Sequence, residues 1–324
     1  MLVDRVRDAI YDCGWRMIFE NDDHPVRIRA FRGSAIRRLL LYIWRLTPGG
    51  PRGVRPAGEL RIQLTGVDPP LLLGQDFQTL LLGWHEPTRM FAGFDVQRRP
   101  RAWGHSPSVQ IRQEAIRDAG RGGFGIYRRA TGGRGEIAVA FSPEAFMDYV
   151  EQQATLHEFA GDVEESAVLT EAARGAQVDL DHVAGHGRRE AVRRVVERVG
   201  QENFRTRILT VYDYACAVCE VQLELVEAAH IIPVPAGGTN RTANGVALCS
   251  IHHEAYDRAL IGIRPDYSVD TNAAALRRLR RVDRHGGWDS FEENLREEIV
   301  LPDRAQDRPD PVALEEGLRL RGWQ

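Results

Sequence analysis

The chain has 324 residues, of which 43% are hydrophobic and 27% are charged, and its formal net charge is −3. This length accommodates two ordinary domains, and the composition is that of a globular protein. The apolar stretch at residues 39–44 is flanked by arginines and is much shorter than the roughly 18 residues of a membrane-spanning helix, so no membrane span is expected. The first fifteen residues carry acidic side chains and lack the apolar core of a signal peptide, which favours a cytoplasmic location.

Arginine supplies all 43 basic residues of the chain. A GC-rich genome would produce the same bias, but the planar guanidinium also binds phosphates and guanine edges with two hydrogen bonds. Residues 1–150 contain 22 arginines against 16 acidic residues, whereas residues 151–185 contain eight acidic residues against Arg174 alone. The front of the chain is therefore the part expected to face a phosphate backbone.

The first 155 residues show the patterns of a mainly antiparallel α+β domain. A helix is predicted from residue 2 to residue 15, and a second helix begins at Ser142 with Pro143 in its first position. Between them we predict strands at residues 26–31, 39–44 and 59–66, a hairpin around residues 85–88, a strand running into a helix at residues 106–119, and a second hairpin around residues 130–135.

The next segments differ in composition. Residues 156–186 are acidic and rich in alanine with weak periodicity, which predicts a linker containing one short helix. Residues 187–212 predict a helix that Gly200 breaks into two pieces.

Three of the four cysteines lie in one window with the spacing of a metal site. Cys216 and Cys219 form one pair, and Cys249 and His252 form another, so that four nitrogen and sulfur ligands could close a tetrahedral zinc site. The hairpin between the pairs is too short to bury a large core, so the zinc would contribute folding free energy directly. Cys13 stands apart and is expected to be a buried apolar side chain.

A second set of residues in this window suits phosphodiester hydrolysis. His230 lies at the end of an apolar strand, and a neutral histidine can take the proton of an attacking water molecule. His253 and Asp257 are four residues apart on a predicted helix and therefore point the same way, as ligands for Mg²⁺ or Mn²⁺. The side-chain amide of Asn244 could bridge the loop backbone and orient His230.

Each of these residues also has a simpler explanation. The Asn244–Gly245 pair could be an ordinary turn. His253 could replace His252 as the fourth zinc ligand, and Asp257 could be a solvated helix residue. Their order along the chain favours the catalytic interpretation over the three separate ones.

The segment 216–257 contains CAVC, EAAHIIP and NGVALCSIHHEAYD, and it resembles the HNH nuclease motif, closest to its McrA-like restriction endonuclease branch. The resemblance implies that His230 is the general base, Asn244 the orienting residue and His253 a metal ligand, and that the substrate is DNA. Many members place a metal ligand directly before the base, whereas this chain has Ala229. The metal would then depend on His253 and Asp257, with Glu227 as a further candidate.

Many McrA-like proteins carry a separate N-terminal reader that limits cleavage to modified DNA, and the present architecture looks similar. The basic stretch at residues 98–108 offers Arg98, Arg99, Arg101 and Trp103 as DNA contacts. Other aromatic residues of this domain are expected mainly in the core. They are Trp15, Trp44, Trp84, Phe91 and Phe94.

The sequence thus predicts an α+β protein with a DNA-reading domain at 1–155, an acidic linker at 156–186, a zinc-stapled ββα-metal HNH nuclease domain at 187–270, and a helical tail at 271–324 that packs on the nuclease. The expected activity is restriction of double-stranded DNA that is foreign or carries modified bases or backbone. A homodimer is one way to cut both strands. Two alternatives stay open: a ligand-gated nuclease effector of a defence system, and a non-catalytic zinc-stapled DNA-binding protein in which Ala229 marks a decayed metal site.

Overall fold

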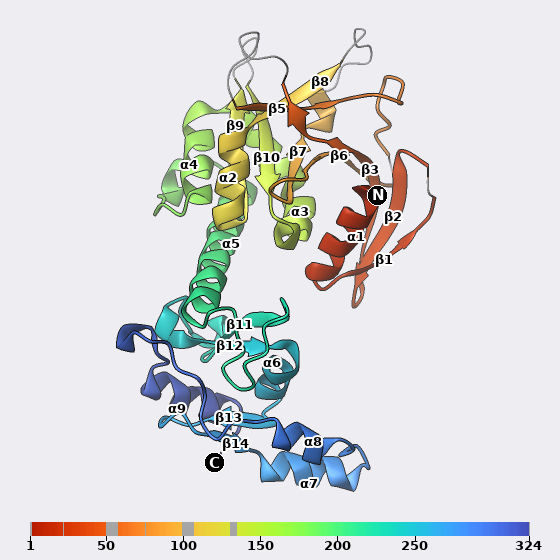
Figure 1. Cartoon of the computed structure of the whole chain (residues 1–324). Coiled ribbons are helices and arrows are strands. Elements are labelled where there is room, and N and C mark those ends of the chain that lie inside the picture. Colours follow the sequence, from red (N-terminus) through yellow and green to blue (C-terminus); the bar gives the residue numbers. More distant parts are fainter. Residues whose placement is uncertain are drawn as a thin grey trace. The chain divides into compact units, whose positions relative to one another are not determined.

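The computed structural model describes residues 2–21, 23–49, 58–74, 76–98, 107–129 and 135–323. The chain divides into two compact units, Met1–Gly200 and Gln201–Gln324, called the first and the second unit below (Figure 1). Among the described residues, no helix combines the length and the apolar character needed to cross a membrane.

The first unit is built on a seven-stranded sheet with the strand order β1-β2-β3-β6-β7-β10-β9. Neighbouring strands are antiparallel except for the parallel pair β3 and β6, which confirms the predicted mainly antiparallel α+β class. The strands are β1 (Arg16–Phe19), β2 (Val26–Arg32), β3 (Ala35–Arg45), β6 (Gln78–His85), β7 (Met90–Phe94), β9 (Phe124–Arg129) and β10 (Glu136–Phe141). A smaller sheet has the order β4-β5-β8, with β4 (Thr47–Pro48), β5 (Glu59–Gln63) and β8 (Ser108–Arg112).

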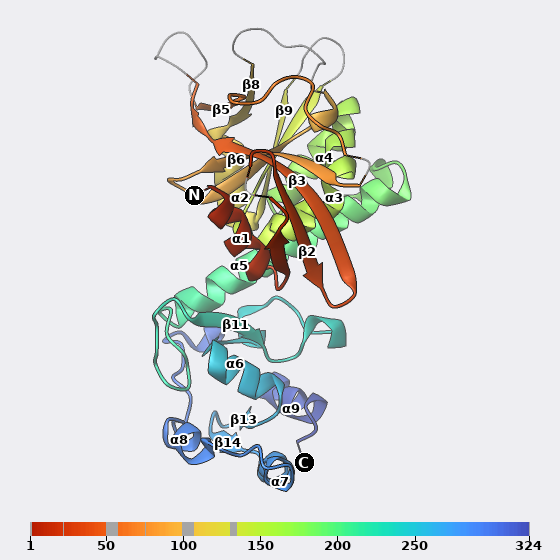
Figure 2. The ribbon, with the colours of Figure 1, turned by 90° about the vertical axis from the view of Figure 1, so that its right-hand side faces the viewer.

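Both faces of the large sheet are covered over most of its width, as Figure 2 shows from the side. Helices α1 (Leu2–Asp12), α3 (Phe146–Glu158), α4 (Val163–Ala173) and the first part of α5 (His186–Val211) pack on one face. The small sheet and α2 (Gln113–Gly122) pack on the other. Burial on both faces explains the nearly continuous apolar run in β3, since alternate residues of that strand enter different cores.

Ser142 precedes a short 3₁₀ turn (Pro143–Ala145) that leads into α3. Helix α3 therefore starts three residues later than predicted.

The acidic segment predicted to be a linker, 156–186, is part of the first unit instead. Helix α4 lies in its middle and places Leu169, Ala172 and Ala173 in the core. Asp162 caps the N-terminus of α4 by accepting hydrogen bonds from two backbone N–H groups, and buried Glu165 pairs with Arg188. Asp162 thus serves as a helix cap and Glu165 as half of a buried ion pair.

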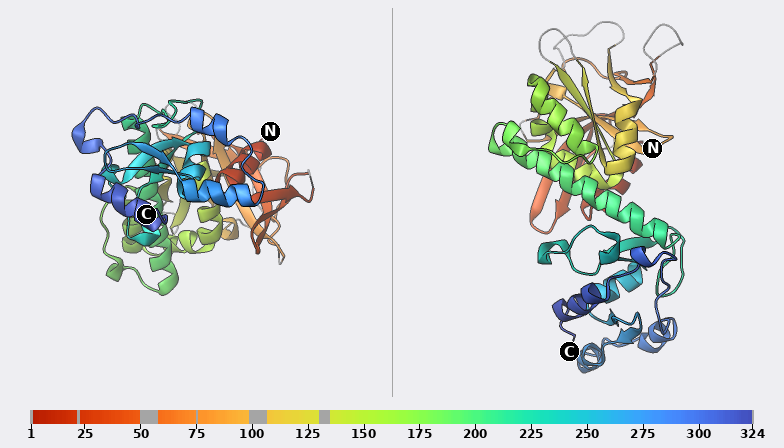
Figure 3. Two further views of the ribbon diagram at one scale, coloured as in Figure 1. Left: turned by 90° about the horizontal axis from the view of Figure 1, so that it is seen from below. Right: turned by 90° about the vertical axis from the view of Figure 1, so that its left-hand side faces the viewer.

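Helix α5 is a single helix of 26 residues, so the predicted break at Gly200 is wrong (Figure 3). A glycine inside a helix costs about 1 kcal/mol relative to alanine. Apolar packing on both sides of Gly200 offsets this cost. The residues before it that enter the first core are Ala191, Val192, Val195 and Val199, and those after it that enter the core of the second unit are Phe204, Ile208, Leu209 and Tyr212.

After the end of α5, the second unit continues with β11 (Val226–His230), β12 (Gly245–Cys249) and α6 (Ser250–Asp257), and the two strands are paired antiparallel. A second hairpin, β13 (Ile261–Ile263) and β14 (Val269–Thr271), and three helices, α7 (Ala273–Arg281), α8 (Trp288–Glu293) and α9 (Pro311–Leu320), complete it. Ile299 and Leu314 from the C-terminal region lie in the same core as Val226 and Tyr256. The predicted helical tail is therefore an integral part of this unit.

Candidate active site

The four residues with zinc-ligand spacing come together in the second unit. One ligand atom from each of Cys216, Cys219, Cys249 and His252 lies within 4.8 Å of all the others. The distance between the Cys219 and Cys249 sulfurs is 3.9 Å, and the His252 Nδ1 lies 3.3 Å and 3.5 Å from the sulfurs of Cys249 and Cys216. Tetrahedral zinc with bonds of about 2.3 Å to sulfur would separate its ligand atoms by about 3.8 Å. The donor set and its spacing both fit this ion.

The thiols of this cluster differ in how readily they ionise. Burial opposes ionisation of Cys216, but hydrogen bonds with His252 and with backbone groups lower its pKa to about 6. Burial raises the pKa of Cys219 to about 12 and also raises that of Cys249. A bound divalent cation would remove the remaining thiol protons, because its charge replaces the lost solvation.

His230 ends strand β11, and its ring is fixed from two sides. Its Nε2 lies 2.9 Å from the Oδ1 of Asn240, and the ring stacks on Phe204 with 3.9 Å between centroids and 10° between planes. Because an amide oxygen only accepts, Nε2 carries the proton and the Nδ1 lone pair is left free. Burial lowers the pKa of His230 below 6.5, although the contact with Asn240 opposes the shift. The imidazole is therefore neutral at neutral pH, as a general base requires.

Asn244 is buried and ties together the loop that follows β11. Its Oδ1 accepts from the N–H of Ile232 at 2.9 Å, and its Nδ2 donates to the carbonyls of Ile232 and Thr239. Gly245 has an extended φ of −141°, so the pair 244–245 is not a glycine turn. A Cβ on Gly245 would lie 2.5 Å from Ile208, which explains why this position has no side chain.

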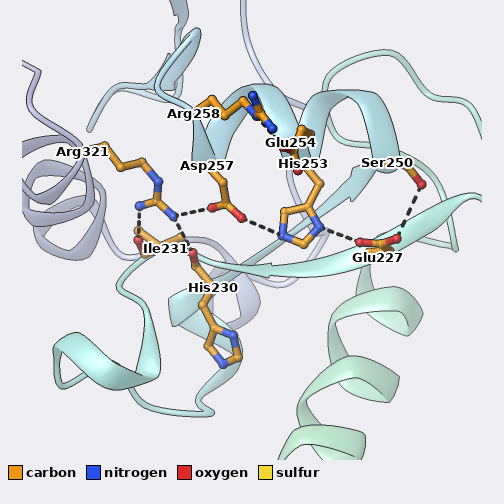
Figure 4. Close-up of polar contacts among 9 residues, drawn as sticks. All are labelled: Glu227, His230, Ile231, Ser250, His253, Glu254, Asp257, Arg258 and Arg321. Carbon is orange, nitrogen blue, oxygen red and sulfur yellow. Dashed lines mark hydrogen bonds and ion pairs between the residues drawn. The ribbon is translucent and has the colours of Figure 1, made fainter. Parts of the chain in front are cut away.

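His253 lies between two carboxylates on one side of α6, as Figure 4 shows. Its Nδ1 is 2.7 Å from the Oε2 of Glu227, and its Nε2 is 3.5 Å from the Oδ2 of Asp257. The hydrogen bond to Glu227 raises the pKa of His253 against the opposing effect of burial, and Asp257 raises it further. Metal-binding histidines commonly donate the other ring N–H to a carboxylate in this way. Glu227 thus directs Nε2 toward Asp257, so that a ring nitrogen and a carboxylate oxygen lie side by side.

An open cleft of about 550 Å³ contains His230, His253 and Asp257. It is further lined by Gln201, Ala228, Pro233, Val234, Pro235, Leu320 and Arg321. Ala229, at the position where many HNH proteins have a ligand, is fully buried in the core, so it points away from this cleft. Another hollow of about 520 Å³, beside Ile251 and Trp288, contains none of these three groups.

Arg321, just beyond α9, is a site residue that the sequence did not indicate. Its side chain is 7% exposed, and its Nη2 contacts the Oδ1 of Asp257 and the carbonyl of His230, each at 3.1 Å. Its Nη1 donates to the carbonyl of Ile231 at 2.6 Å, and the guanidinium lies 4.1 Å from the ring centre of Tyr256. One side chain thus holds both the strand end that carries His230 and the carboxylate of Asp257 (Figure 4).

We expect Arg321→Ala to lower the cleavage rate roughly 100-fold with little change in KM for DNA, since displacement of a reacting group by about 1 Å costs that much. Arg321→Lys should recover only part of the rate, because an ammonium cannot span two carbonyls and a carboxylate. Arg319→Ala is the matched control, since Arg319 is 70% exposed and pairs with Glu316 on the same helix. Equal rates for Arg321→Ala and Arg319→Ala in steady-state assays would exclude a positioning role.

The DNA contacts predicted in the first unit lie at the limit of the described structure. Arg99, Arg101 and Trp103 are outside the described residues, and Arg98 ends the 3₁₀ turn Val96–Arg98 with a side chain that is not described. Most of the other aromatic residues lie in the core, as expected. Trp15, Trp84, Phe91 and Phe94 are at most 2% exposed, whereas Trp44 is half-buried.

The zinc-type cluster, the ββα order and the histidine–carboxylate cleft fit the HNH class of nucleases. Residues 216–264 match the HNH endonuclease family, so this segment is an HNH endonuclease domain and the chain is an endonuclease. Residues 37–150 match a family described as methylase-associated X1. Among solved structures, a modification-dependent TagI restriction endonuclease is similar over 86% of this chain and 81% of that chain, with 11% identity and a TM-score of 0.32. No curated protein matches the chain.

Proposed function

We propose that this endonuclease restricts foreign or modified double-stranded DNA by a one-metal mechanism. The observation that supports the mechanism most directly is the shared cleft, in which neutral His230 lies with His253 and Asp257. A general base and a pair of metal ligands are the two requirements for hydrolysis of an unactivated phosphodiester.

In this mechanism the Nδ1 of His230 takes a proton from the attacking water as the new phosphorus–oxygen bond forms and the bond to the leaving oxygen breaks. Asn240 and Phe204 keep the imidazole in the orientation and tautomer that leave Nδ1 free. Asn244 holds the loop behind it. His253 and Asp257 would hold Mg²⁺ or Mn²⁺, which when bound neutralises charge developing on the phosphate and on the leaving oxygen.

We assign zinc to the cluster of Cys216, Cys219, Cys249 and His252, with a structural role. These four side chains would fill the coordination of a tetrahedral ion and leave no position for water or substrate. This arrangement suits an ion that stabilises the ββα segment and does not take part in the reaction.

We assign the choice of DNA to the first unit, with Arg98, Arg99, Arg101 and Trp103 as candidate contacts. Two observations support the assignment: the match of residues 37–150 to a methylase-associated family, and the excess of arginine over acidic residues in the first 150 positions. A single catalytic cleft per chain cuts one strand at a time, so cleavage of both strands would favour a homodimer.

The test is digestion of matched plasmids that contain cytosine, 5-methylcytosine, 5-hydroxymethylcytosine or phosphorothioate, first with Mg²⁺ and then with Mn²⁺. We expect cleavage that needs the divalent ion and is fastest on one modified substrate. Equal cleavage of all four plasmids would exclude a dependence on modification but would still support nuclease activity. No cleavage of any substrate with either ion would contradict the proposal as a whole and favour a non-catalytic or ligand-gated protein.

A further inference from the structure

Strands β1, β2 and β3 form one edge of the large sheet, and part of their surface faces solvent (Figure 1). Alternate residues of these strands, such as Met17, Ile28 and Leu39, enter the core beneath the helices. The residues between them point to the opposite side and line up in rows through the strand register. The rows are Arg16–Phe31–Ile36 and Ile18–Arg29–Arg38, and beside them Arg27 pairs with Leu40. We call this surface the arginine face; it consists of Arg16, Ile18, Glu20, Arg27, Arg29, Phe31, Ile36 and Arg38.

The arginine face has an excess of positive charge. Arg29 and Arg38 lie directly opposite each other on neighbouring strands, and like charges in this position destabilise a sheet. Arg29 is compensated by Glu20 at 3.0 Å. Within the part of the chain that the structure describes, Arg16, Arg27 and Arg38 have no carboxylate within 4.0 Å. Four arginines against one glutamate give the face a net positive charge, which an anionic partner would complement.

Exposed apolar side chains lie between these arginines. Ile18, Phe31 and Ile36 are 49%, 37% and 56% exposed and are neighbours on adjacent strands, and contiguous exposed apolar side chains are typical of interaction sites. A second copy of the chain would fit poorly, because a two-fold axis would place arginines against arginines with only Glu20 to balance them. A polyanion satisfies the charge, and its sugars and base edges can contact the apolar side chains.

We infer that the arginine face binds the phosphate backbone of double-stranded DNA, with Arg27 and Arg38 among its phosphate contacts. The inference rests on the proposed function, in that the first unit selects the DNA, and it places the contact on β1, β2 and β3. Guanidinium groups suit this task because they bind phosphate oxygens with two parallel hydrogen bonds. Backbone contacts of this kind give affinity and register, and sequence or modification would be read elsewhere on the unit.

The test compares Arg27→Gln/Arg38→Gln with Arg193→Gln/Arg194→Gln in the full chain, both in a His230→Ala background that prevents cutting. The control pair removes the same charge from α5, which packs on the opposite face of the sheet, and both arginines there pair with Glu190. The probes are short duplexes with and without 5-methylcytosine, bound over a range of salt concentrations. Loss of two phosphate contacts should weaken binding roughly 60-fold near 0.1 M salt and reduce the slope of log K against log salt by about 1.8.

Unchanged affinity and slope for the Arg27/Arg38 variant would overturn the inference while leaving the proposed function intact, because the parent would still bind. Binding of neither duplex by the parent, together with no cleavage by the unmutated chain, would overturn both. If the Arg27/Arg38 variant changed from dimer to monomer in sedimentation while its DNA binding stayed the same, the arginine face would be an interface between copies of the chain. That result would also overturn the inference. The thermal midpoint of the variant should be unchanged or raised, since an unfavourable arginine pair has been removed.

Discussion

Replacement of Cys216 by alanine should leave the second unit unfolded while the first unit keeps its structure. The four-ligand cluster joins the segment before β11 to the start of α6, and structural zinc typically contributes about 10–16 kcal/mol of binding free energy. That amount is comparable to the whole stability of a domain, about 5–15 kcal/mol. Hydrogen exchange on the full chain should show loss of protection after residue 201 only. Metal analysis should find about one zinc per wild-type chain and none in the variant.

Cys13→Ala is the matched control for this experiment. Cys13 is a half-buried thiol of the first unit that contacts the carbonyls of Pro143 and Glu144, and burial raises its pKa to about 11. Its loss should cost little and leave the zinc content unchanged. A Cys216→Ala protein that stays folded without zinc would show that the second unit folds without the metal, and one that stays folded with zinc would show that Cys216 is not an essential ligand.

His230→Ala should reduce cleavage by a factor on the order of 10²–10⁴, the usual contribution of a general base, with DNA binding preserved. The ring contacts Asn240 and Phe204 at the edge of an open cleft, so its removal should disturb the fold little. Single-turnover rates at saturating enzyme measure the chemical step directly. His285→Ala, which changes an exposed histidine paired with Asp283 in the same unit, is the control and should cleave normally.

The pH dependence gives this prediction a second measurement. Protonated His230 cannot accept a proton, so the rate should fall as the pH drops through the pKa of this residue. Burial places that pKa below 6.5, and the acid limb should therefore lie at lower pH than for an exposed histidine. Near wild-type rates in His230→Ala, or an acid limb at higher pH than for an exposed histidine, would be incompatible with His230 as the base.

Most of the site could be predicted from the spacing between residues that are close in the sequence. The pairs Cys216–Cys219 and Cys249–His252 can be read from separations of three residues, because a metal knuckle is a local structure. Arg321 could not be found in this way, since it reaches the carbonyl of His230 across 91 positions and only the packing of α9 brings them together. Asn240 lies in the polar loop TNRTAN, where the sequence does not distinguish which asparagine contacts the imidazole.

Most strands of the first unit could be predicted because apolar periodicity and turn residues are local too, whereas the short strands β1 and β4 were not predicted. The sequence prediction is wrong where the average composition of a segment differs from the positions of its individual side chains. Residues 156–186 are acidic on average, but Leu169, Ala172 and Ala173 of α4 enter the core, and buried Glu165 pairs with Arg188. Gly200 has low helix propensity, yet the helix continues because packing of the residues on either side outweighs it.

Adjacent residues of α6 serve two separate groups. The Nδ1 of His252 lies among the cysteine sulfurs, and the ring of His253 lies between Glu227 and Asp257. Successive residues of a helix are rotated by about 100°, so inserting or deleting one residue in this turn would turn both histidines away from their partners at once. In the evolution of such enzymes, changes of length should therefore be absent from α6 and confined to the loops around it. Residues on the outer side of α6, such as Ile251 with 69% exposure, can be substituted without turning either histidine.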